Sequence, residues 1–213
     1  ADKGWTASQI LLTHHHADHV DGVPDLLKAH PARLVGAAAD AHRMPPLDVE
    51  VREGDIVRIG NHEGDVIDVY GHTIGHVAFH FPTAQIMFTG DSLMAMGCGR
   101  IFEGTKPQMW EALQKLAILP PETVVCSGHE YTAANARFAI TVDPENPQLI
   151  SRMEEISATR AAGHYTVPST LEQELATNPF LRPDDPAIQA HLGMTGAPVA
   201  DVFTEIRTRK DNF

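Results

Sequence analysis

Residues 13–19, with the sequence THHHADH, constrain this chain more than any other feature. They follow the apolar residues 10–12, which predict a strand, and they bring four histidines and one aspartate together. Side chains of an extended segment alternate between two faces, so His14 and His16 would point to the same side if the strand continues that far. Two imidazoles on one side can hold one metal ion, and we therefore predict a metal site here.

The other polar residues of this stretch fit the same hypothesis. In an extended chain His15 points away from its two neighbours, whereas in a helix it could share an ion with His19. The strand-like residues before the motif favour the extended arrangement, and the chain must then turn after Ala17 for Asp18 and His19 to meet a second ion. A solvated patch or a tag remnant is the alternative, but a tag would not contain an aspartate.

The composition limits the kinds of protein that this chain can be. The 213 residues can bury a sizeable core, and the 43% hydrophobic and 21% charged fractions are those of an ordinary globular protein. The net charge of −12 argues against a broad nucleic-acid surface, and no apolar run reaches the roughly 20 residues of a membrane-spanning helix. With only Cys98 and Cys126 and no signal-peptide pattern, we expect a cytoplasmic protein with neither nucleic acid nor membrane as a partner.

The remaining pattern predicts a mixed α/β domain over residues 1–129 and a helical domain over residues 130–213, in which no strand is expected. Strands are expected at residues 10–12, 34–36, 56–59, 66–70, 77–81, 85–88 and 123–126, the third and fourth forming a hairpin through residues 60–64. Helices are expected between residues 22 and 30 and at residues 107–116, 133–140, 147–162, 171–177 and 199–209.

The pattern of a strand, a glycine and a metal-capable residue occurs three more times. A glycine stands directly before His72, Asp91 and His129. Glycine lets the backbone leave a strand sharply, and functional residues of layered α/β folds gather at the carboxyl ends of strands. These strand ends can bring seven ligands to one edge, which is too many for one zinc ion but suits two. The predicted ligands are His14, His16 and His72 for one ion, Asp18, His19 and His129 for the other, and Asp91 between them.

Two further residues near these ligands need an interpretation. His76, four positions after His72, is expected to support a ligand rather than to bind metal itself. Cys98 is a rival nucleophile, but no histidine is specifically placed in the sequence to activate it, so a packing or loop role is favoured.

Taken together, these residues resemble the metallo-β-lactamase superfamily, whose HxHxDH motif matches His14, His16, Asp18 and His19. That motif alone marks only the superfamily, which includes lactamases, nucleases, lactonases and dioxygenases. Within it the chain resembles the glyoxalase II (hydroxyacylglutathione hydrolase) family over nearly its whole length. The further matching segments are GHTIGH (71–76), TGD (89–91), GCGR (97–100), GHEY (128–131), VPSTL (167–171), NPFLR (178–182) and the terminal RKDNF (209–213).

The resemblance implies a four-layer αββα sandwich followed by a helical C-terminal domain. It implies hydrolysis of S-2-hydroxyacylglutathione thioesters, usually S-D-lactoylglutathione, to glutathione and D-lactate in methylglyoxal detoxification. The family's glutathione-binding positions correspond to Arg100, Tyr131, Arg207 and Lys210. The last two are three apart and share one helix face, where cations can meet the carboxylates of glutathione; a solvated helix end is the alternative.

The implied cofactor is a pair of divalent metal ions. Zinc is expected first, with iron or manganese as alternatives, because nitrogen and carboxylate ligands suit all three. Asp18 and Asp91 are the expected catalytic residues, acting with a hydroxide that bridges the ions and attacks the thioester carbonyl. The thiolate product can leave without a strong protein acid. The expected partner is the small-molecule thioester, and we expect a monomer.

The sequence departs from the family in two places. Family members normally have several strands before the metal motif, which this sequence does not have, so part of one sheet is expected to be missing. Phe102 stands where some members carry tyrosine, which would remove one hydroxyl contact to glutathione. Two other functions are alternatives at this point: a mononuclear-iron persulfide dioxygenase, against which the full second ligand set argues, and a non-catalytic metal-binding relative.

Overall fold

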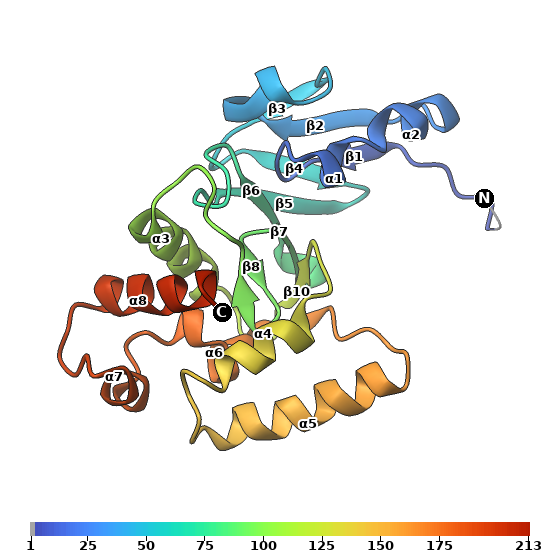
Figure 1. The fold of residues 1–213 in the computed structure, drawn as a ribbon. Helices are drawn as coiled ribbons and strands as arrows, with labels where there is room; N and C mark the ends of the chain where they lie inside the picture. The colour runs from blue at the N-terminus through green and yellow to red at the C-terminus, as the bar shows by residue number, and fades with distance from the viewer. Residues whose placement is uncertain (1–2) are drawn as a thin grey trace.

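Two β-sheets lie against each other at the centre of the molecule, and helices cover their outer sides (Figure 1). The structure, a computed structural model, describes residues 3–213. The resulting order of layers is helices, small sheet, large sheet, helices, as expected for an αββα sandwich. Over the described residues, no helix combines the length and apolarity that crossing a membrane requires.

The smaller sheet delivers the histidine motif to one edge of the molecule. In the described part of the chain it has three parallel strands in the order β1 (Gln9–Leu11), β2 (Arg33–Ala37) and β3 (Val49–Val51). Parallel strands need crossover connections, which here are α1 (Ala17–Val20) with α2 (Val23–Ala29), and the 3-10 helix η1 (Ala38–Arg43). The carboxyl end of β1 leads directly into residues 13–19.

The larger sheet brings three more strand ends to the same edge. Its strand order is β11-β10-β7-β6-β5-β4. From β4 to β7 each strand is antiparallel to the next one, whereas β7 and β10 are parallel neighbours. Strands β5, β7 and β10 therefore run in one direction, and the residues after them leave from one edge. The strands are β4 (Ile56–Ile59), β5 (His62–Asp68), β6 (Val77–Phe81), β7 (Ile86–Gly90), β10 (Val124–Ser127) and β11 (Ser169–Thr170).

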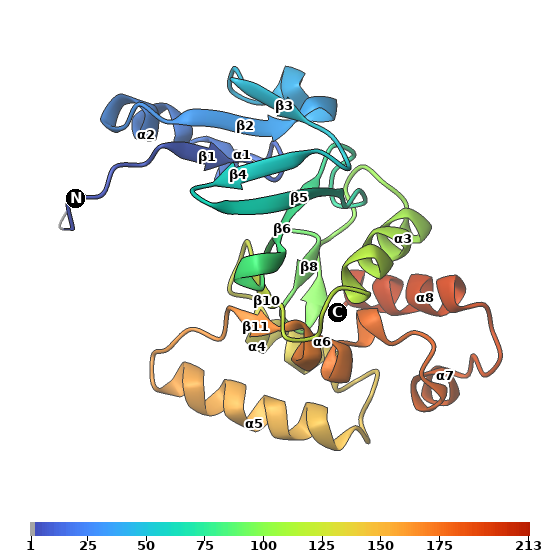
Figure 2. The same cartoon turned by 180° about the vertical axis from the view of Figure 1, so that it is seen from behind.

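Helices from the second half of the chain cover the outer face of the larger sheet, and β11 lies beside β10 near α4 and α6 (Figure 2). The first of them, α3 (Lys106–Ala117), begins at a capping box in which Thr105 and Gln108 satisfy each other's backbone N–H groups. A small hairpin of β8 (Leu93–Met94) and β9 (Gly97–Cys98) lies between sheet and helices. The other helices of the second half are α4 (Thr132–Ala139), α5 (Pro147–Ala161), α6 (Leu171–Thr177), η3 (Pro179–Leu181), α7 (Pro186–Leu192) and α8 (Val199–Asp211). The short 3-10 helix η2 (Pro82–Ala84) connects β6 to β7.

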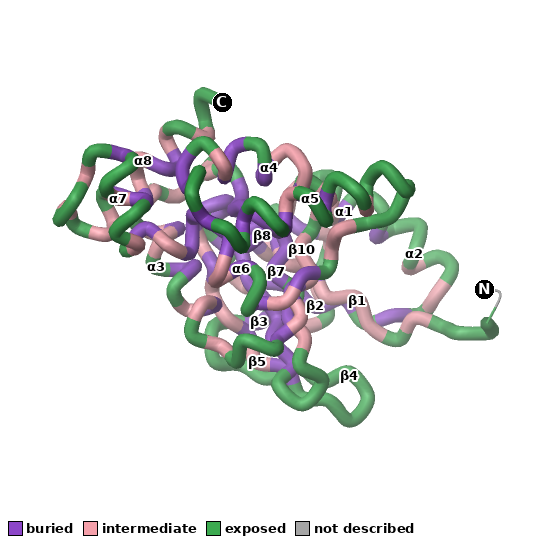
Figure 3. The backbone as a smooth tube through the Cα atoms, turned by 90° about the horizontal axis from the view of Figure 1, so that it is seen from below, coloured by how far each residue is buried: buried purple, intermediate pink, exposed green. Residues whose placement is uncertain are grey.

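The two faces of the larger sheet belong to two hydrophobic cores. Strand β6 is buried along its whole length, and alternate side chains serve different cores. Val77, Phe79 and Phe81 pack toward the smaller sheet, whereas Ala78 packs toward the helices. In Figure 3 the buried chain runs through the centre of the molecule, and β4 lies at the exposed periphery.

The structure corrects several sequence-based expectations. The hairpin between β4 and β5 turns at residues 60–61 alone, with Gly60 at φ +59°, so residues 62–64 belong to β5 and not to a loop. The helical part also contains the two-residue strand β11, because residues 169–170 extend the larger sheet by pairing with β10. Strand β3, the hairpin of β8 and β9, and α7 were not predicted, since segments this short leave no clear periodicity.

Candidate metal centre

The first group of predicted ligands comes from both sheets. Strand β1 ends at Leu11, although the sequence allowed it to continue to His16. His16 nevertheless has an extended backbone, with φ −62° and ψ 146°. His72 follows β5 through Gly71, whose φ is +134°. The ligand atoms of His14, His16 and His72 lie within 4.8 Å of one another.

The second group lies next to the first. Helix α1 begins at Ala17, so the chain turns at the predicted position and presents Asp18 and His19. The Nε2 atom of His129 lies 3.2 Å from Asp18 Oδ2, and His19 Nε2 lies 3.8 Å from the same oxygen. Ligand atoms of these three residues also lie within 4.8 Å of one another.

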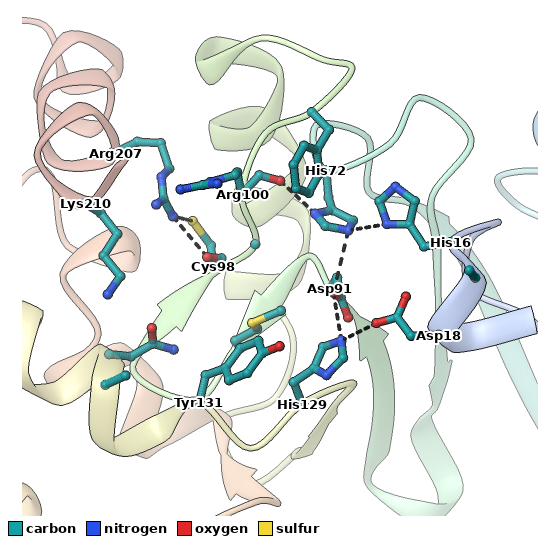
Figure 4. A pocket seen from close by; sticks show the side chains of 16 residues that line it. His16, Asp18, His72, Asp91, Cys98, Arg100, His129, Tyr131, Arg207 and Lys210 are labelled. Atoms are coloured by element: carbon teal, nitrogen blue, oxygen red, sulfur yellow. Dashed lines mark hydrogen bonds and ion pairs between the residues drawn. The ribbon is translucent and has the colours of Figure 1, made fainter. Parts of the chain in front are cut away.

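Asp91 lies between the two groups (Figure 4). Its Oδ1 is 3.2 Å from His19 Nε2, and its Oδ2 is 3.2 Å from His129 Nε2 and 3.6 Å from His72 Nε2. The close approach depends on Gly128, because a Cβ atom there would lie only 2.4 Å from Asp91 Oδ1. The structure thus brings all seven predicted ligands together, with one carboxylate reaching members of both groups.

The donor atoms fit divalent metal ions. Within the described part of the chain, His14 Nε2, His19 Nε2 and Asp91 Oδ1 are buried without a hydrogen-bond partner, which is costly unless a ligand satisfies them. His72 Nε2 and His16 Nδ1 face each other at 3.0 Å. Because His72 Nδ1 donates its hydrogen to the Arg100 carbonyl (2.7 Å), its Nε2 has a lone pair free for a metal. Imidazole and carboxylate donors of this kind suit zinc, iron or manganese.

Burial keeps most of these imidazoles neutral, as ligation requires. It is the main reason why the pKa values of His14, His16 and His72 are lowered, and neighbouring imidazoles add to the effect. The approach of Asp91 raises the pKa of His19. Burial alone would raise the pKa of Asp91, but His19, His129 and His72 outweigh it, so the pKa of this carboxyl is lowered and it is ionised.

His76 lies behind the ligands, where the sequence predicted a supporting role. It is 1% exposed, and its Nε2 accepts the backbone N–H of Asp91 at 3.0 Å. Burial, aided by His72, lowers its pKa to about 3. A neutral His76 with Nε2 as acceptor thus fixes the backbone that carries Asp91.

Five of the seven residues, His16, Asp18, His72, Asp91 and His129, border a pocket of about 790 Å³ (Figure 4), and the buried His14 is not part of its lining. Across the pocket from the ligands, α8 contributes Arg207 and Lys210, which share one helix face as predicted. The Tyr131 ring stacks on His129, with centroids 4.9 Å apart and planes at 10°. Phe102 is 60% exposed and meets His72 edge-on at 5.3 Å. Arg100 is exposed at the pocket wall.

Arg207 and Lys210, the two cationic side chains of α8 at the pocket, differ in their partners. Arg207 is 4% exposed; it donates to the Cys98 carbonyl (3.1 Å) and pairs with Asp211 (2.9 Å). Lys210 Nζ instead lies 5.2 Å from the ring centres of Phe138 and Phe213. Burial is the main reason why the pKa of Lys210 is lowered, and Arg207 adds to it. Burial likewise raises the pKa of the Cys98 thiol, which disfavours the reactive thiolate.

Two polar features near the site, Asn135 and the partner of His15, were not predicted from the sequence. Asn135 lines the pocket from α4 and donates to the Ala95 carbonyl at 3.1 Å. A buried amide on the apolar face of a helix is the signal that could have identified it. His15, which points away from the ligands as predicted, donates to the buried Asp40 at 2.9 Å, and no local pattern indicated that partner.

Family models and relatives agree along the whole chain. Residues 2–129 match the metallo-beta-lactamase superfamily, and residues 130–213 match the hydroxyacylglutathione hydrolase C-terminus. The hydroxyacylglutathione hydrolase of Jannaschia sp. (strain CCS1) is 65% identical over 211 residues, covering 99% of this chain and 82% of that relative. The one from Roseobacter denitrificans is 62% identical, covering 100% of this chain and 84% of the relative.

Solved structures agree on the fold. ETHE1 from Myxococcus xanthus aligns with 99% of this chain and 72% of its own at a TM-score of 0.64 and 24% identity. The di-iron-bound form of TTHA1623 aligns with 84% of this chain and 80% of its own at a TM-score of 0.57 and 28% identity. Together with the matching domains and full-length relatives, this confirms the predicted αββα fold with a helical C-terminal domain. The chain belongs to the hydroxyacylglutathione hydrolase (glyoxalase II) family of the metallo-β-lactamase superfamily.

Proposed function

We propose that this chain hydrolyses S-(2-hydroxyacyl)glutathione thioesters, with S-D-lactoylglutathione as the substrate and glutathione and D-lactate as products, in methylglyoxal detoxification. One observation carries the proposal: a cluster of seven nitrogen and carboxylate side chains, five of which line one pocket, lies across that pocket from Arg207 and Lys210. Relatives 55 to 65% identical to this chain are named hydroxyacylglutathione hydrolase, which supports the same reaction.

Two divalent ions fit the ligand set, with zinc as the first candidate and iron or manganese as alternatives. We assign His14, His16 and His72 to one ion, Asp18, His19 and His129 to the other, and Asp91 to both. When bound, such ions supply Lewis-acid chemistry that acidifies water and polarises a carbonyl oxygen. The neutral imidazoles and the ionised Asp91 have the protonation states that this ligation needs.

The chain's own residues orient the reactants. Asp91 and Asp18 are the catalytic carboxylates: Asp91 is buried between the groups, and the exposed Asp18 faces the pocket beside His129. His72 is held by the Arg100 carbonyl, so one hydrogen bond joins this ligand to the proposed substrate-binding segment. The glutathione thiolate can leave without a protein acid, because a thiol pKa near 8.5 makes it a good leaving group.

Arg100, Tyr131, Arg207 and Lys210 are the proposed glutathione-binding residues. Glutathione is an anionic peptide, and the pocket gathers three cationic side chains although the net charge of the chain is −12. Asp211 neutralises part of the Arg207 charge, so Lys210 and Arg100 are the freer cations. Phe102 offers a ring without a hydroxyl, and thus an apolar edge beside His72.

The division of the chain at residue 130 would separate two tasks. All seven assigned ligands come from residues 1–129, whereas Tyr131, Arg207 and Lys210 come from residues 130–213. We therefore propose a catalytic domain followed by a helical substrate-binding domain, acting as a monomer on a small molecule. The relatives give no support to the persulfide dioxygenase or to the non-catalytic alternative.

The decisive experiment measures hydrolysis of S-D-lactoylglutathione by the purified protein before chelation, after chelation and after zinc, iron or manganese is added back. We expect activity to disappear with the metal and to return with at least one of the three ions. A folded, metal-loaded protein without thioesterase activity would contradict the proposal. Measuring oxygen consumption with a persulfide of glutathione in the same samples tests the dioxygenase alternative directly.

A further inference from the structure

A charged cluster of His15, Asp40, Arg43 and Glu103, here called the Arg43 cluster, lies outside the ligand set. The Arg43 guanidinium donates through Nη2 to Asp40 Oδ1 (2.5 Å) and to Glu103 Oε2 (2.9 Å), and through Nη1 to Glu103 Oε1. His15 Nδ1 donates to the other Asp40 oxygen at 2.9 Å, and its Nε2 lies 3.6 Å from Glu103 Oε1. One arginine thus joins two carboxylates that also face the same histidine.

The members of the cluster come from both sheets. His15 follows β1, and Asp40 and Arg43 lie in η1 after β2, so three members belong to the smaller sheet. Glu103 follows β9 and accepts the backbone N–H of Ile74 at 2.9 Å, next to the loop that carries His72. The cluster is therefore a polar connection between the smaller sheet and the loops of the larger one.

The ligand trio His14, His16 and His72 has the same divided origin. The first two follow β1 of the smaller sheet, whereas His72 follows β5 of the larger sheet. Apolar packing between the sheets is non-directional and does not fix their relative position to a fraction of an ångström. A guanidinium that forks between two carboxylates adds the geometric specificity that apolar packing lacks.

The cluster is enclosed at its Asp40 end, whereas Arg43 and Glu103 are exposed. Asp40 is 1% exposed, and a Cβ atom on Gly75 would lie 2.3 Å from its Cγ atom, so the loop with His72 rests directly on Asp40. Arg43, through its hydrogen bond, is the main reason why the pKa of Glu103 is lowered to about 2. The carboxylate is thus charged at every pH at which the protein would work. The exposed Arg43–Glu103 pair alone would contribute little to stability, but Arg43 also binds the buried Asp40, which anchors the network.

We infer that Arg43 is a positioning residue, which holds the two sheets in the register at which His14, His16 and His72 converge. The inference rests on the proposed function in one respect, that this trio binds a metal ion. Arg43 belongs to none of the candidate ligand groups and does not line the pocket. It acts through Asp40 and His15 on the two ligands that flank His15, and through Glu103 on the loop of His72.

The test compares zinc affinities in an Asp18→Ala background, in which the trio of Asp18, His19 and His129 is incomplete. Adding Arg43→Gln should weaken zinc binding about 10- to 100-fold, the usual loss when a partner that orients ligands is removed. Arg43→Lys keeps the charge but cannot fork between both carboxylates, so it should recover only part of the loss. Affinities are measured by competition with a chelator of known strength.

Arg58→Gln is the matched control. Arg58 pairs with Glu63 at 2.5 Å on the exposed β4–β5 hairpin, away from the site, so zinc affinity should not change. Glu103→Gln removes the carboxylate that pairs with Arg43, but its amide oxygen can still accept the backbone N–H of Ile74. It should weaken zinc binding in the same direction, and the double variant with Arg43→Gln should be little worse than either single one.

Equal zinc affinity with and without Arg43→Gln would overturn the inference. The inference would also be overturned if Arg43→Gln lowered the stability of the metal-free protein but left zinc affinity unchanged, because Arg43 would then have a purely structural role. Additive losses in the double variant would also count against it. The measurement needs no substrate, so a wild-type protein that binds zinc but does not hydrolyse S-D-lactoylglutathione would refute the proposed function and leave this test valid.

Discussion

Asp91 is surrounded by contacts from several elements of the candidate metal centre. Its two oxygens lie 3.2 Å from His19 and from His129, and its backbone N–H is held by His76 at 3.0 Å. Gly128 lies against it without room for a Cβ atom. These contacts allow the carboxylate one orientation, in which it reaches both ligand groups.

Replacing Asp91 with alanine should abolish thioester hydrolysis, because it removes the only carboxylate assigned to both ions. We expect turnover to fall by more than about 100-fold, beyond the usual loss for a residue that merely supports a ligand. The bound metal should fall below two equivalents. Turnover and metal content are measured on the same sample of Asp91→Ala. Asp25→Asn, at an exposed position, is the control and should change neither quantity. Near-normal hydrolysis by Asp91→Ala would refute the binuclear assignment.

Lys210→Gln should raise KM for the thioester and leave kcat nearly unchanged. Lys210 lies across the pocket from the ligands, so its contact with a glutathione carboxylate contributes equally to the ground state and the transition state. Losing a charged hydrogen bond of about 1.5–3 kcal/mol corresponds to roughly a 10- to 100-fold higher KM.

Steady-state kinetics with Lys28→Gln alongside test the assignment of Lys210. Lys28 is exposed and pairs only with Asp25 among the described residues, so its replacement should leave KM unchanged. A loss confined to kcat in Lys210→Gln would instead give Lys210 a role in the chemical step.

Helix α6 holds the hairpin of β8 and β9 through buried polar groups. Glu174 is 0% exposed and accepts from the Met96 backbone N–H (2.8 Å) and from Arg152 (2.5 Å). Asn178 donates to the carbonyls of Met94 (3.2 Å) and Gly97 (3.0 Å). The hairpin in turn carries Cys98, whose carbonyl holds Arg207, so these helix residues support the cationic wall of the pocket.

Glu174→Ala should lower the free energy of unfolding by about 3–5 kcal/mol, because it leaves the Arg152 charge buried without its partner. Urea unfolding of the metal-free protein measures the change. Glu172→Ala, in the same helix but exposed, should shift the free energy by less than about 0.5 kcal/mol. If Glu174→Ala changed the free energy of unfolding as little as Glu172→Ala, the Glu174–Arg152 pair would not be needed for stability.

The two halves of the molecule share one hydrophobic core. Met109, Leu113 and Leu116 of α3 are each 0% exposed, and they pack in a cluster that includes Phe180 and Phe203 from the helical part. The division proposed at residue 130 therefore separates tasks at the site but not the packing that stabilises the fold.

A chain that ends at residue 129 should not fold cooperatively, since it would expose the apolar face of α3. Burying each large aliphatic side chain contributes about 1.5–3 kcal/mol, and the loss over α3 alone is comparable to the 5–15 kcal/mol that stabilises a typical domain. Near-ultraviolet circular dichroism and urea unfolding, with the full chain as reference, test this. A sharp unfolding transition in the shortened chain would mean that residues 1–129 are an independent folding unit.

Features that depend on neighbouring residues could be predicted from the sequence alone. The strand at residues 77–81 and the helix at residues 171–177 lie where the sequence predicted them, and the apolar run of the strand is buried along its whole length. The glycines before His72, Asp91 and His129 indicated strand ends, and those ends lie at one edge. The seven residues share chemistry and local context, so they could be selected as ligands without a structure.

Which distant groups meet depends on how the segments pack in three dimensions. His15 and Arg43 are 28 positions apart, and Glu103 lies 60 positions after Arg43, so no local pattern predicts that they share a cluster. The pairing of Arg207 with Cys98 and of β11 with β10 likewise depends on how helices and sheets pack. Short-range periodicity fixes what each segment can bury, whereas contacts between segments are set by the packing of the whole chain.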